Sequence, residues 1–168
     1  MYSQGQDRQA WDLSTRRRLK TRSYRPEKNR NFYDYIIEIV GAKIMEIGTE
    51  TKTTEEDLRR AINNKTCAVL YFAFDPQEGV LPLEKVVKIA HEFNVPVIVD
   101  AAAELPPREN LKKFYDLGAD LVLFSGGKDL GAPNDTGLIL GRKELVQLWR
   151  RLGPHSYEKV DDKTRIYI

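Results

Sequence analysis

The feature that most limits the fold is a run of eight residues, Cys67–Phe74 (CAVLYFAF), in which every side chain is apolar. A run without polar alternation is typical of a strand at the centre of a parallel sheet, where helices cover both faces. A second run, Val95–Val99 (VPVIV), ends at Asp100, and shorter runs follow at Leu121–Phe124 and Leu138–Leu140. These four segments predict buried strands.

The segments between these runs have helical periodicity. Thr53 and Thr54 precede two glutamates, which is typical of a helix start, because hydroxyls cap the first turn and acids favour its positive end. The sequence also predicts a short strand at Ala42–Ile47 and helices at Leu83–Phe93, Asn110–Leu117 and Lys143–Leu152. Strands that alternate with helices of about ten residues predict an α/β domain with a mostly parallel sheet.

One connection breaks this pattern. The step from Phe124 to Leu138 is too short for a crossover helix, so these two strands are expected to pair antiparallel. In such sheets ligands bind beyond the carboxyl ends of the strands. Asp100 and Lys128 lie in the sequence where two predicted strands have just ended.

Composition limits the class of protein. The chain has 168 residues, enough for one domain with a real core, and its formal charge of +2 predicts no nucleic-acid or membrane partner by itself. It has one cysteine, Cys67, which excludes an intramolecular disulfide and suits a reducing compartment. No apolar run is long enough to cross a bilayer, and the N-terminus lacks the apolar core of a secretory signal. We therefore expect a cytoplasmic protein.

The basic residues gather near the N-terminus, in residues 8–30. We expect a solvated basic arm over residues 1–29, or a basic helix face, with nucleic-acid contact as the alternative.

Two charged side chains have competing interpretations. Asp100 could cap the segment that follows it, or it could be a buried carboxylate held ionised by a cationic partner. Lys128 could be an ordinary solvated lysine. Alternatively, Ser125-Gly126-Gly127 lets the backbone turn tightly, and a lysine in a partly dry site can attack a carbonyl to give a Schiff base.

Other chemistries have little support. A Walker A loop needs glycine where Val122 stands and a hydroxyl where Asp129 stands, and no GxGxxG follows a predicted strand. His91 and His155 have no cysteine or acid at ligand or triad spacing, so we expect no metal site and no catalytic histidine.

Two longer stretches carry a resemblance. VPVIVDAAAELPP (95–107) and GADLVLFSGGKDLGAPNDTGLILGRKEL (118–145) resemble pyridoxal-phosphate enzymes of the aspartate-aminotransferase fold (fold type I). Within that group they look closest to the branch of L-seryl-tRNA selenium transferases and D-glucosaminate-6-phosphate ammonia lyases. The resemblance implies a three-layer α/β/α large domain with a mostly parallel sheet.

The resemblance also implies roles for four residues. Lys128 would form the Schiff base with pyridoxal 5'-phosphate and move protons at the substrate α-carbon. Asp100 would pair with the pyridine nitrogen, Ala102 would lie against the ring, and Ser125 would help to hold the phosphate. The site in this fold is normally built at a dimer interface, which implies a homo-oligomer, and the tRNA-acting relatives imply tRNA as a further partner.

The chain is about half as long as a two-domain subunit of this kind. We therefore interpret residues 30–153 as a partial large domain and residues 154–168 as a tail or the start of a missing C-terminal domain. The leading hypothesis is a pyridoxal-phosphate enzyme, or a fragment of one, that acts on an amino acid-like substrate by elimination or β-replacement. The alternative is a truncated, non-catalytic remnant or a partner subunit that keeps the fold without a complete cofactor site.

Overall fold

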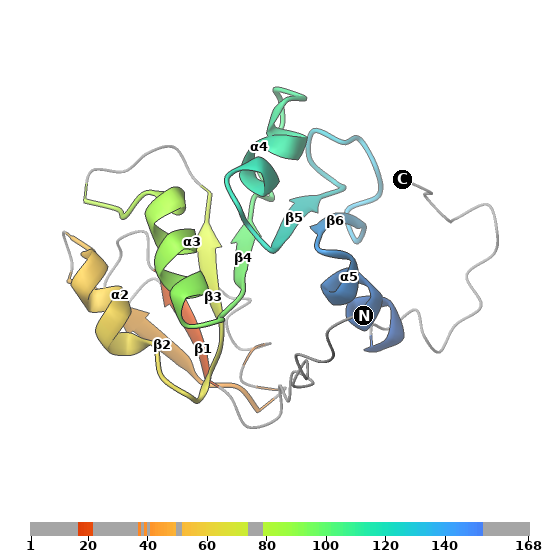
Figure 1. Cartoon of the computed structure of the whole chain (residues 1–168). Helices are drawn as coiled ribbons and strands as arrows, with labels where there is room; N and C mark the ends of the chain where they lie inside the picture. The colour runs from red at the N-terminus through yellow and green to blue at the C-terminus, as the bar shows by residue number, and fades with distance from the viewer. Residues whose placement is uncertain are drawn as a thin grey trace, which may run out of the picture.

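The computed structural model describes residues 17–21, 37, 39, 41–49, 52–73 and 79–152. Its centre is one six-stranded sheet, with the strands in the order β2-β1-β3-β4-β5-β6 (Figure 1). The strands are β1 (Arg17–Thr21), β2 (Ile44–Ile47), β3 (Thr66–Phe72), β4 (Val97–Asp100), β5 (Leu121–Ser125) and β6 (Gly137–Gly141). The helices with full bounds are α2 (Glu55–Ala61), α3 (Leu83–Glu92), α4 (Asn110–Asp116) and α5 (Lys143–Leu152).

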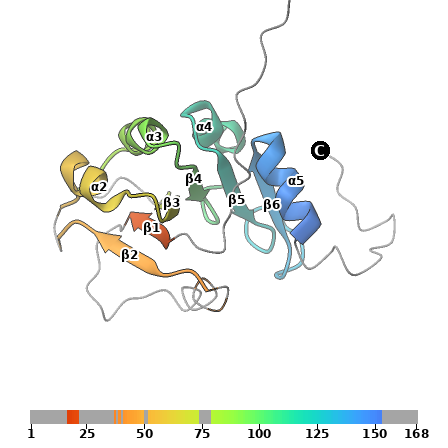
Figure 2. The same ribbon diagram turned by 60° about the horizontal axis from the view of Figure 1, so that its bottom comes forward.

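The predicted α/β class is confirmed. All neighbouring strands pair parallel except β5 and β6, which pair antiparallel, as the short connection between them predicts. Helices α3 and α4 are the crossovers from β3 to β4 and from β4 to β5, and Figure 2 shows α2, α3 and α4 along one side of the sheet with α5 beside β6. Helix α5 has the predicted bounds, and the other predicted elements differ from the observed ones by only a few residues at each end.

The core consists of the apolar runs that predicted the strands. Val69, Val97, Val99 and Val122 of the three central parallel strands are fully buried. Leu58 of α2 and several residues on one face of α3 complete the same apolar cluster. This packing fixes β3, β4 and β5 side by side, and their carboxyl ends form one edge of the sheet.

Helix α2 begins as its sequence predicts. Thr54 is the N-cap, and its hydroxyl accepts a hydrogen bond from the backbone N–H of Asp57 at 3.2 Å. The Asp57 carboxylate accepts the Thr54 backbone N–H at 2.9 Å, which completes a capping box. The Thr54 hydroxyl also donates to Asp57 Oδ2 at 2.6 Å, and this hydrogen bond, followed by the one from the Thr54 backbone N–H, lowers the pKa of Asp57.

The expectation of a solvated basic arm is wrong for Arg17–Thr21. These residues form β1, which lies inside the sheet with β2 on one side and β3 on the other. A strand in this position is stabilised by hydrogen bonds to residues far away in the chain, which local composition does not reveal. The rest of the expected arm and the expected tail after residue 153 lie outside the described residues.

Candidate functional site

The carboxyl ends of β4 and β5 meet at one edge of the sheet, where Asp100 is held by the backbone. It is the last residue of β4, in register with Phe72 of β3 and Leu123 of β5. The Asp100 carbonyl accepts the N–H of Ala73 at 2.9 Å, and the next residue, Ala101, donates its N–H to the Leu123 carbonyl at 2.8 Å. Asp100 is therefore half-buried at the mouth of two parallel strands.

The Asp100 carboxylate has one occupied and one open oxygen. Oδ1 accepts the backbone N–H of Ala102 at 3.1 Å, whereas Oδ2 has no hydrogen bond with any other described residue. The capping interpretation thus holds for a turn and not for a helix, because α4 begins only at Asn110. The expected cationic partner of Asp100 is not found within the described ranges. The open oxygen can accept a donor from outside the chain.

Ala102 lies directly beside this carboxylate. It is half-buried, in the turn whose N–H binds Asp100 Oδ1. The structure thus brings Ala102 and Asp100 together at this end of β4.

Ser125 and Lys128 come from the neighbouring strand. Ser125 ends β5 and is half-buried, and its hydroxyl makes no hydrogen bond to another residue that the structure describes. Lys128 lies in the turn that follows, where its carbonyl accepts the N–H of Gly131 at 3.0 Å. Its side chain is exposed, and its Nζ has no ion pair or hydrogen bond with the described residues. The partly dry site that we expect around Lys128 is therefore not formed by this part of the chain.

Two glycines let the lysine turn fold back on itself. A Cβ at Gly126 would meet the side chain of Thr136 and come within 2.9 Å of its carbonyl, and a Cβ at Gly127 would lie 2.5 Å from Asn134 Cα. In addition, Gly126 donates its N–H to the Thr136 carbonyl at 2.9 Å. The turn before Lys128 is thus fixed by close backbone contact, which only glycine permits here.

A shallow hollow of about 290 Å³ lies next to the lysine turn. Its lining residues come from the segment after β4 and from the two residues after Lys128: Leu105, Pro106, Arg108, Leu111, Asp129 and Leu130. None of the four predicted site residues lines it, so the hollow adjoins the candidate site and does not coincide with it.

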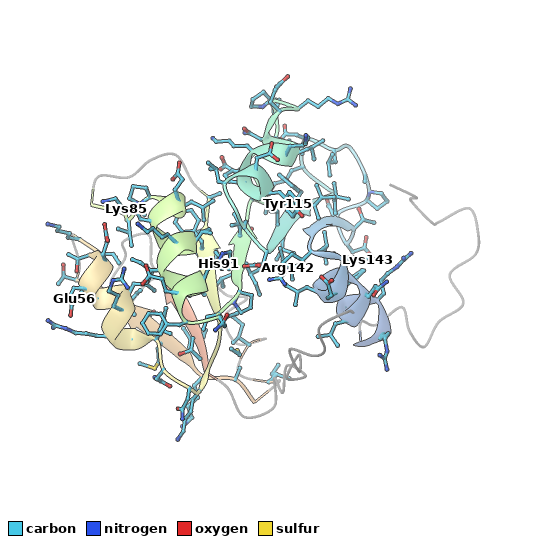
Figure 3. All side chains as sticks on the ribbon, viewed as in Figure 1. Glu56, Lys85, His91, Tyr115, Arg142 and Lys143 are labelled. Carbon is cyan, nitrogen blue, oxygen red and sulfur yellow. The ribbon has the colours of Figure 1, made fainter. Side chains whose placement is uncertain are left out.

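The sequence analysis missed one cluster, built on Asp120. This carboxylate is 2% exposed and precedes β5, at the end of the strand opposite Ser125. Asp120 Oδ2 accepts the backbone N–H of Val97 at 2.7 Å and lies 2.8 Å from His91 Nε2, and Asp120 Oδ1 accepts from Arg142 Nη1 at 3.0 Å (Figure 3). The sequence signal for this cluster is an aspartate directly before a predicted buried strand. Because both of its oxygens are occupied, the Asp120 carboxylate joins α3, β4 and the residue before α5.

Other kinds of site have no support in the described residues. No three histidine, cysteine or acidic side chains among them gather as a metal site. None of their helices is long and apolar enough to cross a membrane.

The chain is similar to known proteins in sequence and in fold. Residues 33–160 match the family model SelA, L-seryl-tRNA selenium transferase. The chain is 40% identical over 112 residues to the D-glucosaminate-6-phosphate ammonia lyase of Salmonella typhimurium, an alignment that covers 66% of this chain and 29% of that protein. It is 32% identical over 139 residues to the L-seryl-tRNA(Sec) selenium transferase of Mannheimia succiniciproducens, covering 71% and 28%.

A solved structure of a D-glucosaminate-6-phosphate ammonia-lyase superposes with a TM-score of 0.63 at 34% identity, over 76% of this chain and 34% of that one. The chain therefore spans about three tenths of the length of the curated relatives that it matches.

Proposed function

Because the chain belongs to the L-seryl-tRNA selenium transferase family, we propose that it carries the lysine and the aspartate of a pyridoxal 5'-phosphate site. Members of this family are pyridoxal-phosphate-dependent enzymes of fold type I. The proposed reaction is elimination or β-replacement on an amino acid-like substrate, with Lys128 as the Schiff-base residue and Asp100 as the partner of the pyridine nitrogen.

The open oxygen of Asp100 is the observation that carries the proposal. Asp100 is half-buried, its Oδ2 has no donor among the described residues, and a nearby positive charge stabilises the ionised form of such a carboxylate. A protonated pyridine nitrogen is such a donor. Lys128, on the turn after the adjacent parallel strand, has an Nζ that is equally uncommitted within the described residues. Both groups have the chemistry that the cofactor requires, and each is free to contact it.

The remaining roles follow from the same edge. Bound pyridoxal phosphate supplies an electron sink for a carbanion at the substrate α-carbon. Ala102 would lie against the ring, and the Ser125 hydroxyl would help to hold the phosphate. Asp100 would keep the pyridine nitrogen protonated, and Lys128 would take the α-proton and pass it to the leaving group. The Gly126-Gly127 turn holds Lys128 at the end of β5.

Trapping the Schiff base tests this proposal. The purified chain is incubated with pyridoxal phosphate, reduced with borohydride, and mapped by mass spectrometry. We expect the label on Lys128, its loss in Lys128→Ala, and its persistence in the matched surface variant Lys112→Ala. Asp100→Asn should weaken cofactor binding, measured by the visible absorption of the bound cofactor. Labelling that spreads over several surface lysines, or that survives Lys128→Ala at full occupancy, would overturn the proposal.

One observation favours the second candidate, a remnant or partner subunit that has kept the fold alone. Lys128 is exposed and not enclosed, so the described residues do not exclude water from it. A folded chain that stays colourless in excess pyridoxal phosphate, and that binds the cofactor only when a longer relative is added, would support this candidate.

For the substrate, we propose an amino acid linked to tRNA, because the names of the relatives suggest this class. The names of several relatives specify L-seryl-tRNA as the molecule on which they act. Salt-sensitive binding of this chain to tRNA is the expected result. No binding at low salt would contradict it.

A further inference from the structure

Lys128 lies in the connection between β5 and β6, which consists of residues 126–136 (Figure 1). The two strands fix only the ends of this connection, where Ser125 pairs with Gly137. A connection of this length can take many conformations, and each ordered residue costs conformational entropy. The position of Lys128 at the end of β5 therefore depends on contacts within the connection itself.

Backbone hydrogen bonds close this connection two residues before the lysine. The Gly126 N–H donates to the Thr136 carbonyl at 2.9 Å, and the Gly126 carbonyl accepts the N–H of Ala132 at 2.8 Å. Both backbone groups of Gly126 are thus bonded to residues that follow Lys128. The end of the connection holds its beginning, and the lysine lies between the two.

The side chain of Thr136 strengthens this closure. Its hydroxyl donates to the Pro133 carbonyl at 2.6 Å, and its backbone N–H donates to the same carbonyl at 3.0 Å. A hydroxyl that bonds to a backbone carbonyl three residues earlier stabilises the turn between them. Because the Thr136 carbonyl is also the acceptor for Gly126, this hydroxyl helps to fix the point at which the lysine turn is held.

The same hydroxyl is packed against the lysine turn. A Cβ at Gly126 would overlap Thr136 Oγ1, so the hydroxyl lies directly beside the backbone of Gly126. The side chain and the carbonyl of Thr136 therefore both contact this glycine. Removal of the hydroxyl takes away a hydrogen bond and a packing contact at the residue that begins the turn to Lys128.

We propose that Thr136 is a positioning residue for Lys128. Its hydroxyl holds the lysine turn in the arrangement from which Lys128 reaches a cofactor bound at Asp100. A lysine that is held in this arrangement before the cofactor arrives loses less conformational entropy on binding. In this role Thr136 acts only through the backbone of the turn. The inference rests on the function proposed above, because it takes Lys128 as the Schiff-base residue.

The test removes the hydroxyl and keeps the shape of the side chain. Thr136→Val exchanges the hydroxyl for a methyl group and remains β-branched. One net hydrogen bond corresponds to about fivefold in an equilibrium constant. The rate at which limiting pyridoxal phosphate and borohydride label Lys128 should fall by about that factor, because fewer chains have the competent turn. Thr136→Ala should show the same loss, and Thr136→Ser, which keeps the donor, should stay within about twofold of the wild type.

Two controls separate position from other effects. The matched variant is Thr49→Val, because the Thr49 hydroxyl also donates to a carbonyl three residues away, that of Lys52 at 3.2 Å, in a turn after β2. It should leave the labelling of Lys128 unchanged. Acetic anhydride modifies exposed amines without a binding step, so it should modify Lys128 equally in the wild type and in Thr136→Val.

The outcomes distinguish this inference from the proposed function. Equal labelling of Lys128 in the wild type and in Thr136→Val would overturn the positioning role and leave the proposed function intact. A wild type without label on Lys128 would overturn both. A loss that Thr136→Ser shares, or that acetic anhydride also reports, would show a general disturbance of the turn and overturn the role of the hydroxyl.

Discussion

Replacement of Asp120 tests how much of the fold depends on one buried carboxylate. Asp120→Ala removes the acceptor of the Val97 N–H and the partner of His91 and Arg142. A buried donor left without an acceptor costs about 1–3 kcal/mol. Because Arg142 and His91 are about half exposed, water solvates them after the change, and the loss of the Arg142 ion pair and the His91 contact adds only about 1 kcal/mol. The free energy of unfolding should fall by about 2–4 kcal/mol.

Urea unfolding, followed by circular dichroism, measures this change. With a slope of about 2 kcal/mol per molar urea, the midpoint should fall by about 1–2 M. Asp120→Asn keeps an oxygen for the Val97 N–H but loses the charge and the acceptor for Arg142, so it should lose less than the alanine variant, about 1–2 kcal/mol. Asp116→Ala, on the exposed side of α4, is the matched control and should change the free energy by less than about 0.5 kcal/mol. Asp120→Ala within about 0.5 kcal/mol of wild type would refute the view that this carboxylate holds β4 and β5 together.

Three smaller predictions follow from single contacts. Thr54→Ala should reduce the free energy of unfolding by about 1 kcal/mol at neutral pH. The Thr54 hydrogen bonds lower the pKa of Asp57. The difference in free energy of unfolding between variant and wild type should therefore shrink as the pH falls through the acid range, where the Asp57 carboxylate becomes protonated. Urea titrations at several pH values measure this difference. Burial, and then the charge of Glu84, raises the pKa of Tyr71 above its usual 10.0. The neutral phenol therefore favours the native state below pH 10, and this contribution to the free energy of unfolding is lost as the pH rises further. Alkaline unfolding of Tyr71→Phe checks it, because the variant should not show this loss of stability. Gly127→Ala places a Cβ 2.5 Å from an Asn134 backbone atom, so the turn must shift; borohydride labelling of Lys128 should fall, and the urea midpoint should fall with it.

The parts of the fold that the sequence predicted correctly are those with local causes. The apolar runs give β3, β4 and β5 because a strand covered by helices must be apolar on both faces. The cap at Thr54 and the length of the Phe124–Leu138 connection are likewise visible in a few neighbouring residues. Each depends on residues close in sequence, so pattern and structure agree.

Strand β1 is the element that local sequence patterns did not predict. RRLKT has neither apolar alternation nor a β-branched run, and its only strand-forming advantage is the pair of open edges that β2 and β3 offer on its two sides. Both edges come from later parts of the chain. A strand that depends on distant hydrogen-bond partners has no local pattern for the sequence to display.

The two aspartates beside the central strands show the same limit at the site. Asp100 follows a buried strand and Asp120 precedes one, so the sequence presents two carboxylates at equally protected positions. In the structure the two carboxylates differ in the hydrogen bonds that their oxygens accept. Contacts from α3, from β4 and from Arg142 before α5 occupy both oxygens of Asp120, whereas among the described residues only a backbone N–H two residues away reaches the Asp100 carboxylate. A carboxylate whose two oxygens accept hydrogen bonds from the chain stabilises the fold. A carboxylate with an oxygen that accepts none from the described residues can bind a ligand. Since the satisfying groups come from three separate elements, this distinction can be made only after the chain has folded.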